Sequence, residues 1–201
     1  MLRRMSAPTA PPDTSTRDRV LEISRELFSS YSFAEVSLAA IAREAGVSTT
    51  LIIKLFQSKE RLFEETVDFS SSARALFAGP FEDLGWTAVG ETLSAPFTAH
   101  YSMIRTLSVT GGSVDSLSAI GRRISGDILE VLTRRIATEA PHPYPAPELR
   151  AQSAVALLTG LSFMRRVGDT EFTSFDREEL HHHYARLVQD ILTGSATPAA
   201  R

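Results

Sequence analysis

The sequence predicts an all-α protein, and three observations lead to that prediction. Apolar residues recur at intervals of three and four along most of the 201 residues, which is the period of an amphipathic helix. No segment alternates apolar and polar residues as a half-buried strand would. Hydrophobic residues make up 43% and charged residues 22% of the chain. This is a globular composition, and the length is sufficient to bury a substantial core.

The first two helices are predicted from the residues at their ends. Ser15 followed by Asp18 forms a capping box that begins the first helix. Ser37 is a favourable N-cap for a second helix over residues 38–45. Gly46 follows that helix, and glycine most readily takes the left-handed conformation that ends a helix.

Two further helices are expected after very short turns. Ser48 is the N-cap of a third helix, which turns Ile52 and Phe56 inward. A fourth helix begins after Ser58 and is expected to continue to about Phe69. Four helices therefore fit within about sixty residues.

The rest of the chain is predicted to form a larger helical domain. We expect one or two helices over residues 81–109 and one long helix whose apolar stripe covers 114–136. Two final helices are expected over 148–167 and 176–192. The prolines within 141–147 separate the long helix from these two, because proline cannot continue a helix.

Domain boundaries follow from this helix order. We expect a DNA-binding domain over residues 14–58 and a domain for effector binding and dimerisation over 59–193. Residues 1–13 and 194–201, rich in small residues and proline, are expected to be disordered tails.

Composition excludes several classes of protein. The chain has no cysteine, which excludes disulfides and thiolate metal sites. It has no apolar run of the roughly 18 residues that a membrane span needs, and no membrane partner is expected. Without an export signal, the expected location is cytoplasmic. The net charge of −3 gives no general sign of nucleic-acid binding, so that function must rest on local features.

Residues 38–57, LAAIAREAGVSTTLIIKLFQ, have the pattern of a helix-turn-helix motif. Gly46 permits the tight turn, and Ala42 permits the two helices to cross closely. Five apolar residues take the inward positions: Ile41, Ala45, Val47, Ile52 and Leu55. An αα-hairpin that only packs is the alternative, but all seven positions agree with the DNA-binding motif, whose second helix lies in the major groove.

The outward face of that second helix is predicted to contact DNA. Hydroxyl and amide groups can hydrogen-bond to base edges, and a methyl group can pack on thymine. A lysine can neutralise a phosphate, and the N-terminus of a helix favours one. The predicted DNA-binding residues are Ser37, Ser48, Thr49, Thr50, Ile53, Lys54, Gln57 and Lys59.

Residues 17–63, and above all SLAAIAREAGVSTTLIIKLFQSKERLF, resemble the N-terminal domain of the TetR family of transcriptional regulators. The resemblance implies a three-helix DNA-binding domain, joined through a fourth helix to a larger domain that dimerises and binds a small-molecule effector. It also implies that Ser37 caps the second helix and touches phosphate, that Lys59 contacts phosphate, and that Phe56 is a buried aromatic residue.

Two positions depart from the family pattern. Ile53 stands where the family commonly has a phosphate-binding tyrosine, and Leu55 stands where it commonly has a histidine. Two backbone contacts typical of the family are therefore missing, and Lys54 is the candidate replacement for one of them.

The larger domain is expected to bind an apolar small molecule. Large side chains with a few polar groups are suited to line such a pocket, although each of them could equally fill an ordinary core. The predicted pocket residues are Trp86, Phe97, His100, Tyr101, Met103 and Phe163.

The last two helices are predicted to form a homodimer interface of four helices. The first of them carries small residues that permit close approach: Ser153, Ala156, Gly160 and Ser162. The second carries a wide apolar stripe: Leu180, Tyr184, Leu187, Val188 and Ile191.

These features together predict a sequence-specific DNA-binding regulator, a ligand-responsive repressor that acts as a homodimer on a two-fold operator. No catalytic constellation or cofactor motif is found, so no enzyme activity, catalytic residue or cofactor is expected. One alternative is a helical carboxylate metalloenzyme, suggested by the Glu-x-x-His pairs in 178–182. Consecutive histidines point about 100° apart on a helix, so no metal site is predicted. A second alternative is an interaction module that has lost DNA binding.

Overall fold

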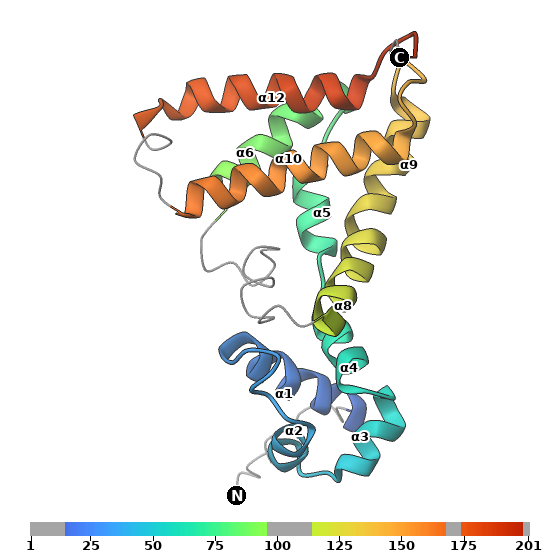
Figure 1. Ribbon diagram of the computed structural model, residues 1–201, viewed down its shortest axis with the longest axis vertical. Coiled ribbons are helices and arrows are strands. Elements are labelled where there is room, and N and C mark those ends of the chain that lie inside the picture. Colours follow the sequence, from blue (N-terminus) through green and yellow to red (C-terminus); the bar gives the residue numbers. More distant parts are fainter. Residues whose placement is uncertain (1–14, 96–113, 168–173, 199–201) are drawn as a thin grey trace, which may run out of the picture.

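The computed structural model describes residues 15–95, 114–167 and 174–198. Every named element in these ranges is a helix, which confirms the all-α prediction. Figure 1 shows a small helical domain at one end of the molecule and a larger helical domain at the other. None of the described helices is both long enough and apolar enough to cross a membrane.

The small domain contains four helices that begin where the sequence predicts, and it includes the fourth helix, which lies beyond the expected boundary at residue 58. Their bounds are α1 Thr16–Ser30, α2 Leu38–Ala45, α3 Thr49–Phe56 and α4 Lys59–Thr66. Each begins after a serine whose hydroxyl accepts the backbone N–H three residues later, which satisfies one of the free donors at a helix start. These serines are Ser15, Ser37, Ser48 and Ser58.

Three phenylalanines from separate segments fill the core of the small domain. The ring of Phe63 meets the ring of Phe28 edge-on with 4.9 Å between centroids, and that of Phe33 with 5.2 Å. Ile41 and Ile52 are completely buried beside them. This packing holds α2 and α3 against α1 and α4.

The fourth helix is shorter than predicted. It ends at Thr66, an extended link follows, and α5 covers Ser70–Leu76. The link is held by the larger domain: Arg123 donates to the Val67 carbonyl at 2.8 Å, and Asp127 accepts the Phe69 N–H at 3.0 Å. Because tertiary partners take these backbone groups, the helix cannot continue through them.

The larger domain is built from long helices that pack side by side (Figure 1). Residues 114–139 form one continuous helical run that includes a π-helical turn, η2. The elements are η1 Phe81–Asp83, α6 Leu84–Ser94, α8 Val114–Ile124, η2 Ser125–Leu129, α9 Glu130–Glu139, α10 Pro147–Val167 and α12 Arg177–Thr193.

Helices α6 and α12 approach each other closely at Gly85. A Cβ atom on this glycine would lie 2.3 Å from the Ala185 carbonyl oxygen of α12. The Gly85 N–H instead donates to Gln189 Oε1 at 2.9 Å. Only glycine permits this contact, which brings the buried faces of α6 and α12 together.

The C-terminal segment departs from the expected disordered tail at its beginning. Ser195 pairs with Tyr144 through two backbone hydrogen bonds of 3.2 and 2.6 Å. The buried Arg150 donates to the Leu192 carbonyl at 3.0 Å. These contacts fix the end of α12 against the loop before α10. The expected N-terminal tail, 1–13, lies outside the described residues.

Candidate nucleic-acid interface

The turn between α2 and α3 has the geometry of a helix-turn-helix. Gly46 has φ 64° and ψ 35°, the left-handed conformation that ends α2. The Val47 N–H donates to the Ala42 carbonyl at 3.0 Å. Ala42 and Ala45 are buried at the crossing of the two helices. The predicted roles of the glycine and the alanines in the turn are confirmed.

The outward face of α3 is exposed to solvent in the described chain. Ile52 and Phe56 are buried, whereas Thr50, Lys54 and Gln57 are exposed. Ile53 lies among these three with 48% of its surface exposed, and Thr49 at the helix start is half-buried. Figure 1 shows α3 at the end of the molecule farthest from the large domain, where duplex DNA can reach it.

The two serines at the starts of α2 and α3 have a hydroxyl proton left to donate. The Oγ atom of Ser37 accepts the Ala40 N–H at 3.0 Å, and that of Ser48 accepts the Leu51 N–H at 3.1 Å. Both serines are exposed. A hydroxyl that accepts from the helix can still donate to an anion held at the helix start.

The C-terminal end of α3 is a sharp turn that the sequence did not indicate. Gln57 has φ 70° and ψ −46°, and the Ser58 N–H donates to the Phe56 carbonyl at 2.8 Å. This is a γ-turn, a conformation that is strained for a residue with a side chain. It leaves only two residues between the end of α3 and the start of α4, so the recognition helix and α4 are tightly joined.

Lys59 is directed into the small domain. Its ammonium group donates to the Phe33 carbonyl and lies 4.2 Å from the centre of the Phe33 ring. Burial lowers the pKa of Lys59 from its ordinary value. The contact ties the start of α4 to the loop between α1 and α2, and it leaves two of the three ammonium donors for other partners.

Comparison with known proteins identifies the family. Residues 20–66 match the model of bacterial regulatory proteins of the tetR family, and residues 82–192 match that of the tetracyclin repressor-like C-terminal domain. The second match alone covers more than half of the chain. The chain belongs to the TetR family. It is therefore a DNA-binding transcriptional regulator with an N-terminal helix-turn-helix and a C-terminal helical domain.

Solved structures of TetR-family regulators have the same fold. A TetR-family regulator from Streptomyces coelicolor A3 is 25% identical, with a TM-score of 0.57 over 93% of this chain and 99% of its own. NemR from E. coli, in its reduced form, is 18% identical, with a TM-score of 0.58 over 88% and 97%. NalD from Pseudomonas aeruginosa, the secondary repressor of a multidrug efflux pump, is 22% identical, with a TM-score of 0.53 over 86% and 94%. No curated protein sequence matches the chain significantly.

The predicted effector residues of this TetR-family chain are only partly described. Phe97, His100, Tyr101 and Met103 lie outside the described residues. Trp86 and Phe163 are 46% and 52% exposed. The Trp86 ring stacks on that of His181 with 3.8 Å between centroids, on the outer surface of α6 and α12.

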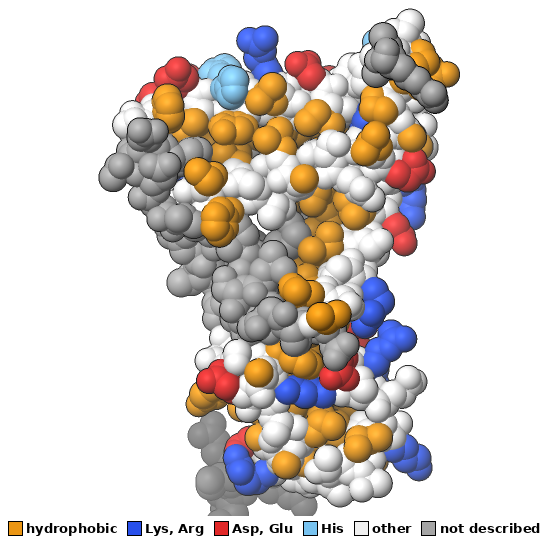
Figure 2. Space-filling model, viewed as in Figure 1, with side chains coloured by type: hydrophobic (Ala, Val, Ile, Leu, Met, Phe, Trp, Pro, Cys, Tyr) orange, Lys and Arg blue, Asp and Glu red, His pale blue; other side chains and the backbone are white. Residues whose placement is uncertain are grey.

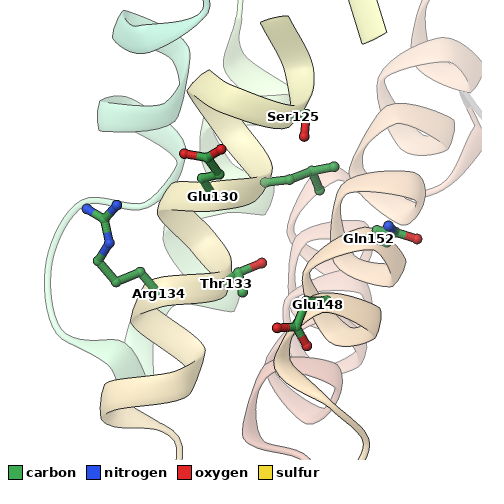
Figure 3. Close-up of a pocket in the computed structure, with 7 residues that line it drawn as sticks. Ser125, Glu130, Thr133, Arg134, Glu148 and Gln152 are labelled. Carbon is green, nitrogen blue, oxygen red and sulfur yellow. The ribbon is translucent and has the colours of Figure 1, made fainter. Parts of the chain in front are cut away.

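Two cavities in the described part of the larger TetR-family domain are lined mostly by polar residues. One of about 420 Å³ lies between α9 and α10, and one of about 670 Å³ lies along α12. Figure 3 shows the first, with Thr133 on one side and Gln152 and Glu148 on the other. Neither cavity is lined by Trp86 or Phe163, so the structure does not bring these two residues together at either one.

The histidine rings of α12 pack against neighbouring aromatic rings. The Nε2 atom of His181 lies 2.9 Å from the Trp86 carbonyl oxygen, and His182 meets the same indole ring edge-on with 4.8 Å between centroids. Among the residues with described positions, no group of three or more histidine, aspartate or glutamate side chains is placed to hold a metal ion. Nothing here supports the metalloenzyme alternative.

The junction between the two domains of this TetR-family chain contains charged residues that sequence reasoning did not assign a function. Arg122 of α8 forms a salt bridge of 2.7 Å with Glu64 of α4, and Arg123 forms one of 2.8 Å with Asp127. The adjacent arginines were a visible signal, but charged pairs at helix surfaces are common, and only the fold shows what lies opposite them.

Proposed function

We propose that this TetR-family chain is a ligand-responsive repressor that binds a two-fold operator as a homodimer. The proposal rests above all on the exposed outer face of α3. Thr50 and Gln57 have hydrogen-bonding groups for base edges, and the Ile53 side chain fits against a thymine methyl group. Lys54 adds a positive charge for a phosphate beside them.

Phosphate contacts beside the major groove would fix the position of α3 on the duplex. Ser37 and Ser48 can each donate a hydroxyl hydrogen bond at a helix start, and Thr49 lies in the first turn of α3. Lys59 can offer its remaining two donors, although its ammonium group is anchored to Phe33. We assign these four residues to positioning rather than to sequence readout.

The outer faces of α10 and α12 are the proposed dimer interface. Figure 2 shows hydrophobic side chains gathered over these two helices. On α10 the stripe recurs at helical spacing and consists of Leu149, Ser153, Ala156, Gly160 and Phe163, with Ser162 half-buried beside it. On α12 it consists of Leu180, Tyr184, Leu187 and Ile191, each exposed or half-buried.

Val188 takes no part in that interface, because only 1% of its surface is exposed. It packs in the core of its own subunit. The adjacent Leu187 is 40% exposed and takes the outward position. Two helices from each subunit would then form a four-helix contact around a two-fold axis, which matches the symmetry of a palindromic operator.

An apolar effector would act by favouring one conformation of the larger domain. A ligand can lower DNA affinity only by as much as it prefers the conformer that does not fit the operator. We keep Phe97, His100, Tyr101 and Met103 as proposed pocket walls. Trp86 is too exposed for a wall and suits a rim, and Phe163, also too exposed for a wall, is assigned to the dimer interface instead. Since its target is bacterial DNA, we place the protein in the cytoplasm.

Selection from random duplex DNA with the purified full chain tests this function. We expect enrichment of a two-fold sequence whose half-site centres are one helical turn, about 34–36 Å, apart or a multiple of it. A Thr50→Ala variant should select a different base at one position of each half-site. Recovery of unenriched sequences would instead favour the interaction module without DNA binding, and metal analysis of the same sample would test the metalloenzyme.

A further inference from the structure

We propose that Glu64, Arg122, Arg123 and Asp127 form an ionic latch between the two domains, which positions the recognition helix and opens when DNA is released. The four are positioning residues that act through α4 and touch no base or phosphate. This inference rests on the proposed function, but the latch itself can be tested without DNA.

The first half of the latch joins α4 directly to α8. Arg122 donates to one Glu64 carboxylate oxygen through Nε at 2.9 Å and through a terminal nitrogen at 2.7 Å. The Glu64 side chain is 15% exposed and that of Arg122 is 47% exposed, so only the carboxylate side of the contact is shielded from solvent. The two residues lie 58 positions apart in the sequence and belong to different domains, so the contact can transmit movement between them.

The second half of the latch holds the extended link between α4 and α5. Arg123 donates to the Val67 carbonyl at 2.8 Å and pairs with Asp127 at 2.8 Å. Asp127 accepts the Phe69 N–H at 3.0 Å. The carbonyl at the end of α4 and the N–H just before α5 are thus both held by one ion pair of the larger domain. If that pair moves, the link loses both partners.

The ion pair crosses the border between α8 and a π-helical turn, so a change in this turn would move both arginines of the latch. Asp127 lies within η2, Ser125–Leu129, and Arg123 lies in α8 just before it. A π turn closes hydrogen bonds over one more residue than an α turn, so reverting to α geometry would rotate α8 against α9 by about 100°. Arg122 and Arg123 would then leave their partners on α4 and its link.

Space for such repacking exists beside the turn. The cavity of about 420 Å³ between α9 and α10 is lined by Ser125 and Leu129 of η2. Figure 3 shows Ser125 at one end of this cavity, above Thr133. The side of the turn that carries Ser125 and Leu129 is therefore not closely packed against α10.

A rotation of α4 would move α3 and its DNA-binding face by almost the same amount. The γ-turn at Gln57 and the cap at Ser58 leave almost no flexible chain between α3 and α4. In a homodimer, two closed latches would hold the two recognition helices at one fixed separation. Open latches would let that separation vary, so the helices would no longer fit successive major grooves at the same time.

A charge exchange tests the latch. Glu64→Arg and Arg122→Glu each replace the attraction with repulsion, and the double variant restores an opposite-charged pair in reversed order. Asp127→Ala removes the acceptor of the Phe69 N–H, whereas Asp127→Asn keeps an acceptor and loses the ion pair. Glu139→Ala is the matched control, since its ion pair with Arg135 lies within α9.

Amide hydrogen exchange, measured without DNA, is the first readout. The Phe69 amide should exchange on the order of tenfold faster in Asp127→Ala, because it loses its charged acceptor. It should also exchange faster in Glu64→Arg and in Arg122→Glu, because repulsion between α4 and α8 moves Asp127 away from the link. Exchange should return toward wild type in the double variant and be unchanged in Glu139→Ala. Equal exchange at Phe69 in wild type and all single variants would overturn the latch, whether or not the protein binds DNA.

Half-site spacing in DNA selected from random duplexes is the second readout. Wild type and the double variant should select one spacing, and the single variants should select a broader range with the same half-site sequence. Faster exchange with unchanged spacing would overturn the positioning role. If wild type enriches no sequence at all, the proposed function fails, while the exchange data still decide whether the latch exists.

Discussion

Arginine side chains make many of the contacts between helices. The chain has nineteen arginines and two lysines, and the sequence gives no reason for the difference. In the structure, guanidinium groups reach backbone carbonyls at or near helix ends, where the last carbonyls lack partners within the helix. The pairs are Arg123 with Val67, Arg135 with Phe77, Arg165 and Arg177 with Leu93, and Arg150 with Leu192.

The two lysines occupy different environments, although sequence reasoning assigned both to phosphate. Lys54 is exposed on α3, whereas Lys59 is half-buried against Phe33. Lys54→Ala should lower the slope of log affinity against log salt by about one and leave stability unchanged. Lys59→Ala should also lower the free energy of unfolding, because it leaves the Phe33 carbonyl without its donor.

Binding titrations over a range of salt concentrations, with urea unfolding of the same samples, separate these effects. A salt slope for Lys54→Ala equal to that of wild type would remove Lys54 from the phosphate contacts. Unchanged stability of Lys59→Ala would show that its contact with Phe33 contributes nothing to the fold.

Two helical elements differ from their predicted form for the same reason. The apolar spacing predicts one helix from Ser58 to about Phe69 and an uninterrupted α-helix over 114–136. The structure ends α4 at Thr66 and inserts a π turn at Ser125–Leu129. The two irregular segments lie opposite each other and share the bond from the Phe69 N–H to Asp127. Tertiary hydrogen bonds at the domain junction therefore override the local helical preference.

The packing of α6 on α12 gives a prediction for one glycine. Gly85→Ala would place a methyl group 2.3 Å from the Ala185 carbonyl oxygen, so the helices must separate. We expect a loss of about 1–3 kcal/mol in the free energy of unfolding, as for other overpacked sites. Chemical denaturation measures it.

Gly121→Ala is the control for this substitution. Gly121 is also in a helix, but nothing lies within 4 Å of its Cβ position. Alanine there should be neutral or should stabilise the protein by up to about 1 kcal/mol, since it favours the helix. A destabilisation of Gly85→Ala no larger than that of Gly121→Ala would contradict the close packing of α6 on α12.

The stability of the protein should depend on pH because of the ion pair between Glu64 and Arg122 at the domain junction. The hydrogen bond from Arg122 lowers the pKa of Glu64 from its ordinary value of 4.5. A carboxyl group whose pKa is lower in the folded state stabilises the fold fully above its unfolded pKa and loses that contribution as pH falls through the folded value. Wild type should therefore lose stability below about pH 4.5 more steeply than Arg122→Ala.

Urea unfolding at a series of acidic pH values tests the expectation. The difference between wild type and Arg122→Ala is the informative quantity, because other carboxyl groups titrate in both proteins. A difference that stays constant from neutral pH to about pH 3 would mean that Glu64 and Arg122 are not coupled.

A large residue at Gly160 should disrupt the proposed dimer. This glycine is exposed on α10, and no atom lies within 4 Å of its Cβ position in the subunit. Gly160→Leu should therefore leave the monomer folded but prevent the close approach of a partner helix, shifting the equilibrium to monomer. Gly121→Leu, equally open but on α8, should leave the equilibrium unchanged. Sedimentation equilibrium measures both, and a dimeric Gly160→Leu would place the interface elsewhere.

The sequence alone determined the helix-turn-helix. Serine caps, Gly46 and the apolar spacing all act within a few residues, and local preferences decide such structure. The same reasoning did not find the γ-turn at Gln57, since no glycine or asparagine signals it. It also assigned Val188 to the interface, because a stripe on a helix does not show how much of it a neighbour in the same subunit covers.

The way in which the two domains are joined depends on tertiary contacts. Glu64 and Arg122 are 58 residues apart, and no local pattern distinguishes them from other charged residues on helix surfaces. The end of α4, the π turn and the inward position of Lys59 all depend on groups that lie far away in the sequence. Local spacing specifies which helices form and which face each one buries, while the partners of charged and backbone groups at helix ends exist only once the helices have packed.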